Sequence, residues 1–141
     1  MAIIVVGTGL ASRPASQRMN KSGAYGPTSS SPTLLPVWTP DPAFPGTNLV
    51  ADQLVVDRPG IIDITARMVV TANSLSGTVT GYIYKNNASI KSASSNTVST
   101  IGLDIAGIVV AQGDLIDMRV SNNFGTVAIG DIGTYLQFVA A

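Results

Sequence analysis

Apolar and polar residues alternate most regularly between Asp57 and Val70, in the run DRPGIIDITARMVV. The apolar positions that follow the Pro59-Gly60 turn are Ile62, Ile64, Ala66, Met68 and Val70. The polar positions between them are Asp63, Thr65 and Arg67. A period of two places one face on a core and the other in water, so this run predicts a half-buried β-strand.

Similar apolar runs continue to the C-terminus and predict a series of strands. We expect them at 49–57, 60–72, 77–85, 88–94, 97–110, 114–121, 126–130 and 133–140. The connecting segments carry turn-forming pairs: Asn73-Ser74, Asn86-Asn87, Gln112-Gly113, Asn122-Asn123 and Ile132-Gly133. Asn86-Asn87 predicts a two-residue hairpin turn, because Asn tolerates positive φ. Strands about 8–12 residues apart, with no helical period, predict an all-β antiparallel sandwich or barrel over residues 48–141.

The region before residue 48 has a different composition. Residues 11–47 hold seven of the eight prolines, together with many Ser, Gly, Thr and Asn residues. Proline fixes φ and removes a ladder donor, so we expect extended or irregular chain here. The sequence therefore predicts an extended N-terminal arm and first edge segment over 1–47, with the arm itself at 1–32. The apolar residues expected to lie against the body in the edge segment are Leu34, Leu35, Val37, Trp38 and Phe44.

The chain is long enough for one domain, and it contains neither cysteine nor histidine. Disulfides and thiolate metal sites are therefore excluded. The missing histidine removes the commonest general base, and the serine clusters have no evident activator. We expect no enzyme, no cofactor, no metal and no small-molecule substrate.

Charged residues make up only 11% of the chain, against roughly 25% in typical soluble domains. With so little charge, we expect partners to cover much of the surface. Residues 1–32 carry three basic groups and no acidic one, whereas residues 33–141 carry five basic and eight acidic groups. The arm would then dock on an acidic surface, such as a neighbouring copy of the body. A few solvating charges on a polar arm are the alternative.

Several motifs suggest other chemistry. The run IIVVGTGLAS at 3–12 resembles a glycine-rich phosphate loop, but Ser12 replaces the third glycine and Pro14 interrupts the required helix. Asp114 with Asp117, or Asp57 with Asp63, could form a carboxylate pair for calcium or acid–base chemistry. We favour a turn role for Asp114, and we expect Asp117 to face water beside Arg119. The basic groups of the arm lack interleaved aromatics apart from Tyr25, so no nucleic acid is expected.

The sequence contains no run of about 18 apolar residues that would span a bilayer, so no membrane partner is expected. The opening MAIIVVGTGL lacks the basic start and the length of a signal peptide. We therefore expect the protein to be made and used without secretion through a signal sequence.

Four motifs occur in a specific order: GIIDITARM, GYIYKNNASI, VVAQGDLIDMRVSNN and GTYLQFVAA. This order resembles the jelly-roll heads of the complement first-component and tumour necrosis factor superfamily. It is especially similar to the versions found in virion proteins of tailed bacteriophages. Ile62 and Asn87 depart from the pattern, which usually has Tyr and Gly there. The resemblance covers about residues 48–141 and implies a jelly-roll sandwich that closes into a homotrimer.

The resemblance also implies that one sheet face lies along the threefold axis of the trimer. Tyr82, Tyr84 and Tyr135 alternate with an opposite set that includes Ile83, Leu136 and Phe138, and either set could face the axis. Alternatively, the tyrosines cover a solvated sheet. The resulting trimer-interface candidates are Tyr82, Tyr84, Tyr135 and Phe138.

These observations predict a capsid decoration protein that binds the phage head as a trimer and stabilises the shell. Its partners would be other copies of itself and the major capsid protein. It would be made in the host cytoplasm and located on the outer capsid surface. The candidate capsid contacts in the arm are Ile3, Ile4, Val5, Arg13, Arg18, Lys21 and Tyr25. The alternative is a minor tail or fibre-tip protein whose trimeric head recognises the host surface.

Overall fold

The alternating run after Pro59 forms strand β6 (Gly60–Asn73), the longest of the described strands. Its five alternating apolar residues, from Ile62 to Val70, are each at most 2% exposed. Thr65 and Arg67 point to the opposite face and are half-buried. The inward face predicted from the sequence is therefore confirmed.

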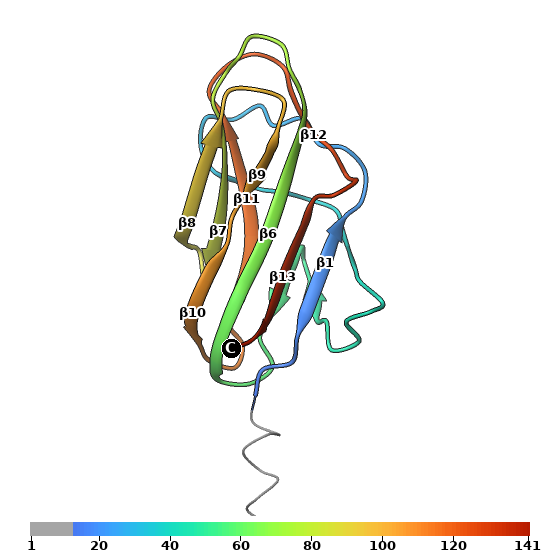
Figure 1. Cartoon of the computed structure of the whole chain (residues 1–141), viewed down its shortest axis with the longest axis vertical. Coiled ribbons are helices and arrows are strands. Elements are labelled where there is room, and N and C mark those ends of the chain that lie inside the picture. The colour runs from blue at the N-terminus through green and yellow to red at the C-terminus, as the bar shows by residue number, and fades with distance from the viewer. Residues whose placement is uncertain (1–12) are drawn as a thin grey trace, which may run out of the picture.

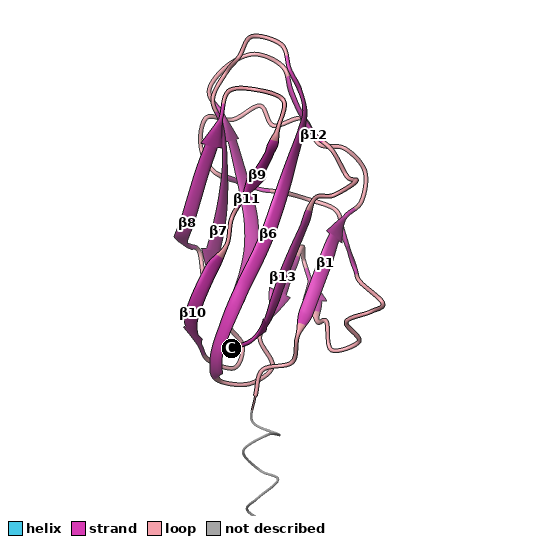
Figure 2. Ribbon diagram, in the orientation of Figure 1, coloured by secondary structure: helices cyan, strands magenta, loops and turns pink. Residues whose placement is uncertain are grey.

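The computed structural model describes residues 13–141, which form two antiparallel β-sheets packed face to face, with no helix among them (Figure 1, Figure 2). Hydrogen-bonded neighbours are often distant in sequence, so the chain crosses repeatedly between the sheets. This arrangement confirms the predicted all-β jelly-roll sandwich.

The first sheet has seven strands in the order β10-β6-β13-β1-β3, and β9 and β12 also pair with β6. Besides β6, these strands are β1 (Gln17–Lys21), β3 (Trp38–Pro40), β9 (Thr100–Gly102), β10 (Ile105–Val110), β12 (Val127–Ile129) and β13 (Tyr135–Ala140). We call it the seven-stranded sheet.

The second sheet has six strands in the order β4-β5-β11-β7-β8, and β2 pairs with β11. They are β2 (Thr33–Leu34), β4 (Leu49–Val50), β5 (Gln53–Val55), β7 (Val79–Lys85), β8 (Ala88–Ser95) and β11 (Leu115–Asn122). Asn86 and Asn87, between β7 and β8, have φ values of 51° and 65°. Both lie in the left-handed region that such a hairpin requires, so the predicted turn is confirmed.

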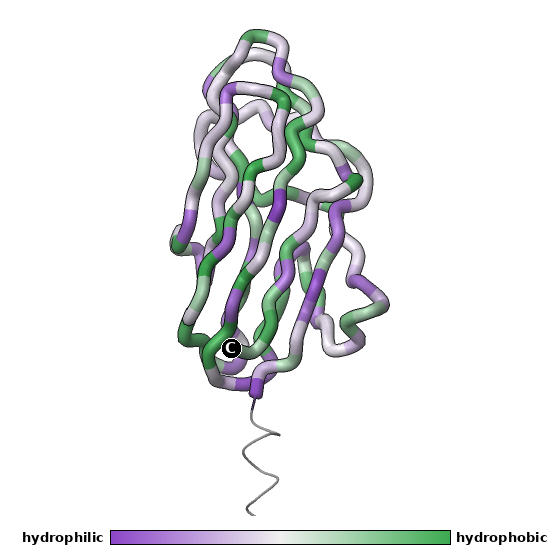
Figure 3. The backbone as a smooth tube through the Cα atoms, viewed as in Figure 1, coloured by the Kyte–Doolittle hydropathy of each residue, from purple (hydrophilic) through white to green (hydrophobic). Residues whose placement is uncertain are grey.

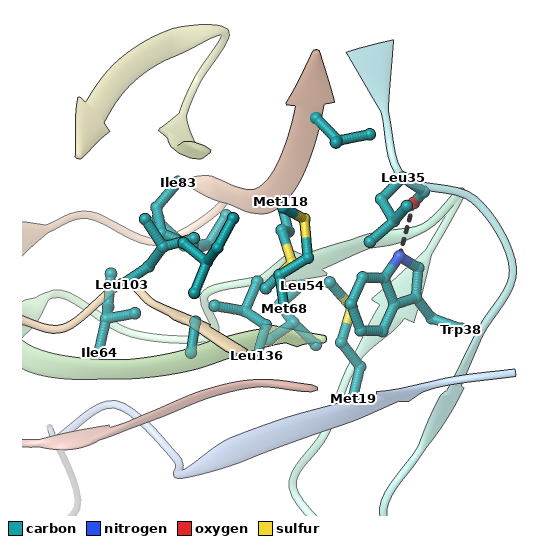
Figure 4. Close-up of a cluster of buried hydrophobic side chains, with 14 of the residues drawn as sticks. Met19, Leu35, Trp38, Leu54, Ile64, Met68, Ile83, Leu103, Met118 and Leu136 are labelled. Carbon is teal, nitrogen blue, oxygen red and sulfur yellow. Dashed lines mark hydrogen bonds between the residues drawn. The ribbon is translucent and has the colours of Figure 1, made fainter. Parts of the chain in front are cut away.

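The core fills the space between the two sheets. Met68 and Leu136 from the first sheet meet Ile83 and Met118 from the second, and none of the four has exposed surface (Figure 4). Figure 3 shows how hydrophobic and hydrophilic residues alternate along the strands that surround this core. Burying each such side chain stabilises the fold by about 1.5–3 kcal/mol relative to leaving it exposed.

The prediction of an extended arm over residues 1–32 needs correction, because residues 17–21 form strand β1 of the seven-stranded sheet. Strand β1 pairs with β13 on one side and with β3 on the other, and Met19 is fully buried. Gln17 is equally buried, and its Nε2 donates to the Val55 carbonyl at 2.7 Å. Polar residues therefore occupy part of the inward face of β1 and obscure its alternation. Residues 1–12 lie outside the described part of the chain.

Part of the expected edge segment, residues 38–40, forms a strand of the seven-stranded sheet. Strand β3 lies at the edge of the seven-stranded sheet, and Leu35 and Trp38 enter the core. The indole Nε1 of Trp38 donates to the Leu35 carbonyl at 2.6 Å (Figure 4). Val37, between them, is 56% exposed, and Phe44 is half-buried.

Candidate interaction surfaces

Residues 13–141 hold no pocket, and they contain no group of three or more acidic side chains placed to bind a metal. Within the same range, no helix has the length and apolar character needed to cross a membrane.

The aspartates singled out in the sequence do not form the suggested pairs. Asp57 accepts a hydrogen bond from the Ala15 amide, whereas Asp63 accepts one from the Gly107 amide, both at 2.9 Å. Asp114 accepts from the Ala111 amide at 2.8 Å and from the Asn86 side chain at 2.9 Å. Asp114 therefore has the turn role predicted for it, and it also joins the β10–β11 turn to the β7–β8 hairpin.

Asp114→Ala should lower the free energy of unfolding at pH 7 by about 1 kcal/mol, because two hydrogen bonds to a largely solvated carboxylate are lost. Burial acts to raise the pKa of Asp114, but the Ala111 amide, the Asn86 amide and Lys85 outweigh it and lower the pKa overall. This stabilisation is therefore present above the unfolded-state pKa and is lost as the pH falls through the folded-state pKa. Urea unfolding should show wild type and variant converging in acid. An unchanged difference at low pH would contradict the assigned role.

Asp117 lies on the outer side of the six-stranded sheet but is fully buried, contrary to the expectation that it faces water. Arg119 Nε donates to its Oδ1 at 2.9 Å, and Gln53 Nε2 donates to its Oδ2 at 2.7 Å. The Arg119 guanidinium also lies 4.1 Å from the centre of the Tyr84 ring. Hydrogen bonding to Asp117 raises the pKa of Arg119, against the opposing effect of burial. These contacts leave Asp117 without exposed surface and occupy the middle of the outer face of the six-stranded sheet.

Tyr82 lies beside Tyr84 on the same outer face. The two rings meet edge to face with their centres 6.0 Å apart, and the Tyr82 hydroxyl hydrogen-bonds to Ser121 at 2.9 Å. Tyr135 lies on the outer face of the other sheet, because its neighbour Leu136 points into the core. The three tyrosine candidates are thus divided between opposite faces of the sandwich.

Phe138 is fully buried between the sheets, and the hypothesis that it lines a trimer interface is corrected accordingly. It follows Leu136 on the inward side of β13, where both side chains pack into the core. A side chain without exposed surface contributes to folding and not to contact with another subunit.

The outer face of the seven-stranded sheet changes from polar to apolar along its length. In its middle, Arg18 lies 3.9 Å from the centre of the Tyr135 ring and donates to Gln137, while Arg67 pairs with Asp104. That pairing lowers the pKa of Asp104 and raises the pKa of Arg67.

Toward the start of β6 the same face becomes apolar. Ile61 pairs with Val109 across β6 and β10, and the two are 49% and 67% exposed. Val139 is half-buried on the neighbouring β13, opposite Asp63, whose carboxylate accepts a hydrogen bond from the Gly107 amide. We call Ile61, Val109 and Val139 the apolar corner.

The arm candidates fall into three groups. Ile3, Ile4 and Val5 lie outside the described residues, whereas Arg13 is exposed. Arg18 is held against Asp41, with 3.3 Å between Nε and Oδ2. Among the described arm candidates, Arg13 alone is exposed.

Lys21 and Tyr25 also belong to the body. The Lys21 ammonium is nearly buried and donates to the carbonyls of Ser22 and Val37. Burial lowers the pKa of Lys21, although Asp52 and Asp131 oppose the shift. Tyr25 forms a backbone bridge with Ile129. The assignment of Arg18, Lys21 and Tyr25 to a free arm is therefore corrected.

The sequence patterns did not reveal a second surface, which lies at the end of the sandwich where β6, β8 and β11 finish (Figure 1). It consists of the loops 74–78, 96–99 and 123–126, which we call the loop end. Each loop exposes one large apolar side chain: Leu75 by 59%, Val98 by 60% and Phe124 by 56%.

Comparisons with known proteins define the fold class. Neither a family model nor a curated protein matches the sequence. Solved structures do match, and three of them are tumour necrosis factor-like jelly rolls. Eiger TNF from S. frugiperda is 12% identical with a TM-score of 0.66, and the match covers 92% of this chain and 93% of that one.

The other two neighbours agree. Murine APRIL is 15% identical with a TM-score of 0.64, and the match covers 92% of this chain and all of that one. GITRL from bushbaby is 19% identical with a TM-score of 0.56, covering 92% and 95% of the two chains. At these identities the similarity shows a shared fold, and it supports the jelly-roll sandwich that the resemblance implied.

Proposed function

We propose that this chain is a structural protein of a tailed-phage virion, and specifically a capsid decoration protein that binds the head surface as a homotrimer. The main support is the order of the four motifs that resemble phage virion heads. In the structure they lie on β6, on the β7–β8 hairpin, on β11 and on β13 of one jelly roll. The low charge of the chain adds to this support. No enzymatic role is part of the proposal.

The proposed trimer contact is the outer face of the seven-stranded sheet. Its apolar corner leaves Ile61 and Val109 about half or more exposed, which is costly in water and favourable against another subunit. Tyr135 lies on the same face and would extend the contact. Tyr82 and Tyr84 lie on the outer face of the six-stranded sheet and so fall outside this contact.

The proposed contact with the major capsid protein is the stretch before Pro14, with Ile3, Ile4, Val5 and the exposed Arg13. Pro14 packs so closely on Gly60 that a Cβ at Gly60 would approach Pro14 Cδ to 2.6 Å. This packing places Pro14, next to the exposed Arg13, beside the start of β6. Three such stretches in one trimer would bind the shell multivalently.

Counting copies of the chain in purified particles tests the function. A decoration protein should be present in numbers comparable to the shell subunits, because it covers the shell surface. A copy number matching that of tail components would contradict decoration and favour the alternative.

The alternative is a tail or fibre-tip protein whose trimeric head recognises the host surface. The observation that favours it is the loop end, which presents three exposed apolar side chains. Loops at one end of a rigid sandwich are a common place for recognition.

A further inference from the structure

We propose that the loop end contacts a membrane, inserting Leu75, Val98 and Phe124 shallowly into the interface of a neutral, zwitterionic lipid bilayer. This inference goes beyond the proposed virion role and does not depend on it. It departs from the expectation of no membrane partner, which rested only on the lack of a membrane-spanning run in the sequence. It rests on the exposure of these three side chains, on the internal hydrogen bonding of the loops and on the absence of charge there.

The loops 74–78 and 123–126 are packed closely together. Ser74 N donates to the Thr126 carbonyl, and Thr126 N donates back to the Ser74 hydroxyl, both at 3.0 Å. Gly77 approaches the other loop so closely that a Cβ there would lie 2.0 Å from the Phe124 carbonyl oxygen. The two loops therefore hold each other in place, and Leu75 and Phe124 are exposed on one packed unit.

Asparagine side chains satisfy the backbone of these two loops. Asn73 bonds to both the amide and the carbonyl of Gly77, at 3.0 and 2.8 Å. Asn122 donates to the Gly125 carbonyl and accepts from the Phe124 amide, while Asn123 accepts from the Thr78 amide at 2.7 Å. Backbone groups that enter lipid must find partners within the protein, and these loops supply such partners.

In the third loop, 96–99, hydroxyl groups form the hydrogen bonds that satisfy the turn. Ser95 Oγ contacts the Ser99 hydroxyl at 2.7 Å and accepts from the Thr97 amide at 3.2 Å. The Ser99 carbonyl in turn accepts from the Val70 amide and ties this loop to β6. The exposed Val98 side chain lies within this self-bonded turn.

No residue of the three loops is charged, and neither is any residue of 22–32, whose Ser29 carbonyl accepts from Asn122. The opposite end of the sandwich carries Asp57, Arg58, Lys85 and Asp114. A surface without ionic groups enters the lipid interface without desolvating charge. It also lacks the basic residues that attract anionic headgroups, so a zwitterionic bilayer is the partner it fits.

A lipid interface fits these features, because the three apolar side chains lie among exposed Ser, Thr and Asn residues that carry no charge. Uncharged hydroxyl and amide groups can stay hydrated at the level of the headgroups while Leu75, Val98 and Phe124 enter the boundary of the acyl chains. The Asn73 and Asn122 amides are already paired within the loops.

Flotation with phosphatidylcholine vesicles tests the proposal. Wild type should float with the vesicles, and the Leu75→Ser/Phe124→Ser variant should lose binding by about tenfold per side chain removed. Val50→Ser is the matched control, since Val50 is 54% exposed and lies in the β4–β5 hairpin. It should float like wild type. Binding should not change with salt or with added phosphatidylserine, because the inserting surface is uncharged.

A tryptophan variant tests whether the loop end itself contacts the lipid. Phe124→Trp should fluoresce more strongly with vesicles and be quenched by brominated lipid, whereas native Trp38, only 6% exposed, should be unaffected. Failure of wild type to float would overturn the proposal. Full binding by a folded double variant would also overturn it, as would binding only to anionic vesicles at low salt. The same holds if the emission of the introduced tryptophan does not respond to brominated lipid.

Discussion

We expect Ile64→Asp to unfold the protein or to destabilise it by several kcal/mol. Ile64 is 2% exposed and lies among apolar side chains of the core, so the new carboxylate would be buried without a partner. A cost of this size is a large fraction of the roughly 5–15 kcal/mol that holds a typical domain together. Thermal unfolding followed by circular dichroism would measure it.

Ala72→Asp is the control on the same strand. Ala72 lies near the end of β6 and is exposed, so its substitution should change stability by less than about 0.5 kcal/mol. A folded Ile64→Asp protein with near-normal stability would show that the inward face of β6 is wrongly assigned.

Two N-terminal truncations should behave very differently. Deleting residues 2–12 leaves every described strand in place, and we expect a folded protein. Deleting residues 2–32 also removes β1, which lies between β13 and β3 and carries the buried Met19. Loss of a Met side chain from a core typically costs about 2–5 kcal/mol by itself, and here the strand pairing is lost as well.

The longer deletion should therefore yield insoluble or unfolded protein. The extent of cooperative unfolding in the two truncated proteins is the measurement. A protein starting at residue 33 that unfolds cooperatively at the wild-type temperature would show that β1 is dispensable, as a free arm would be.

Most of the sandwich could be predicted from the sequence, because its strands follow a simple period. The predicted strand at 60–72 is β6, and the predicted turn at Asn86-Asn87 has the expected backbone. The predicted strand at 97–110 is interrupted between Gly102 and Ile105, where Leu103 still reaches the core. Local alternation and turn chemistry were sufficient for these elements.

Strand β1 could not be predicted in this way. Its inward residues are Gln17, Met19 and Lys21, and only one of them is apolar. The other two are buried because Val55, Ser22 and Val37 supply acceptors from elsewhere in the chain. Those partners become visible only once the fold brings them together.

The candidate surfaces were still harder to predict. The apolar corner joins residues 61, 109 and 139, and the loop end joins residues 75, 98 and 124. Each surface is assembled from single side chains in separate loops or strands, so no single window of the sequence contains the whole surface. The burial of Asp117 could not be predicted for a related reason: Gln53, which donates a hydrogen bond to it, is 64 residues away in the sequence.

The mass of the protein in solution tests the proposed assembly most directly. Light scattering should give three times the 14.5 kDa chain mass. Val109→Asp should shift the protein toward the monomer without unfolding it, because it charges the exposed apolar corner. A wild-type mass of one chain, unchanged at high protein concentration, would contradict the trimer and the shell-binding role built on it.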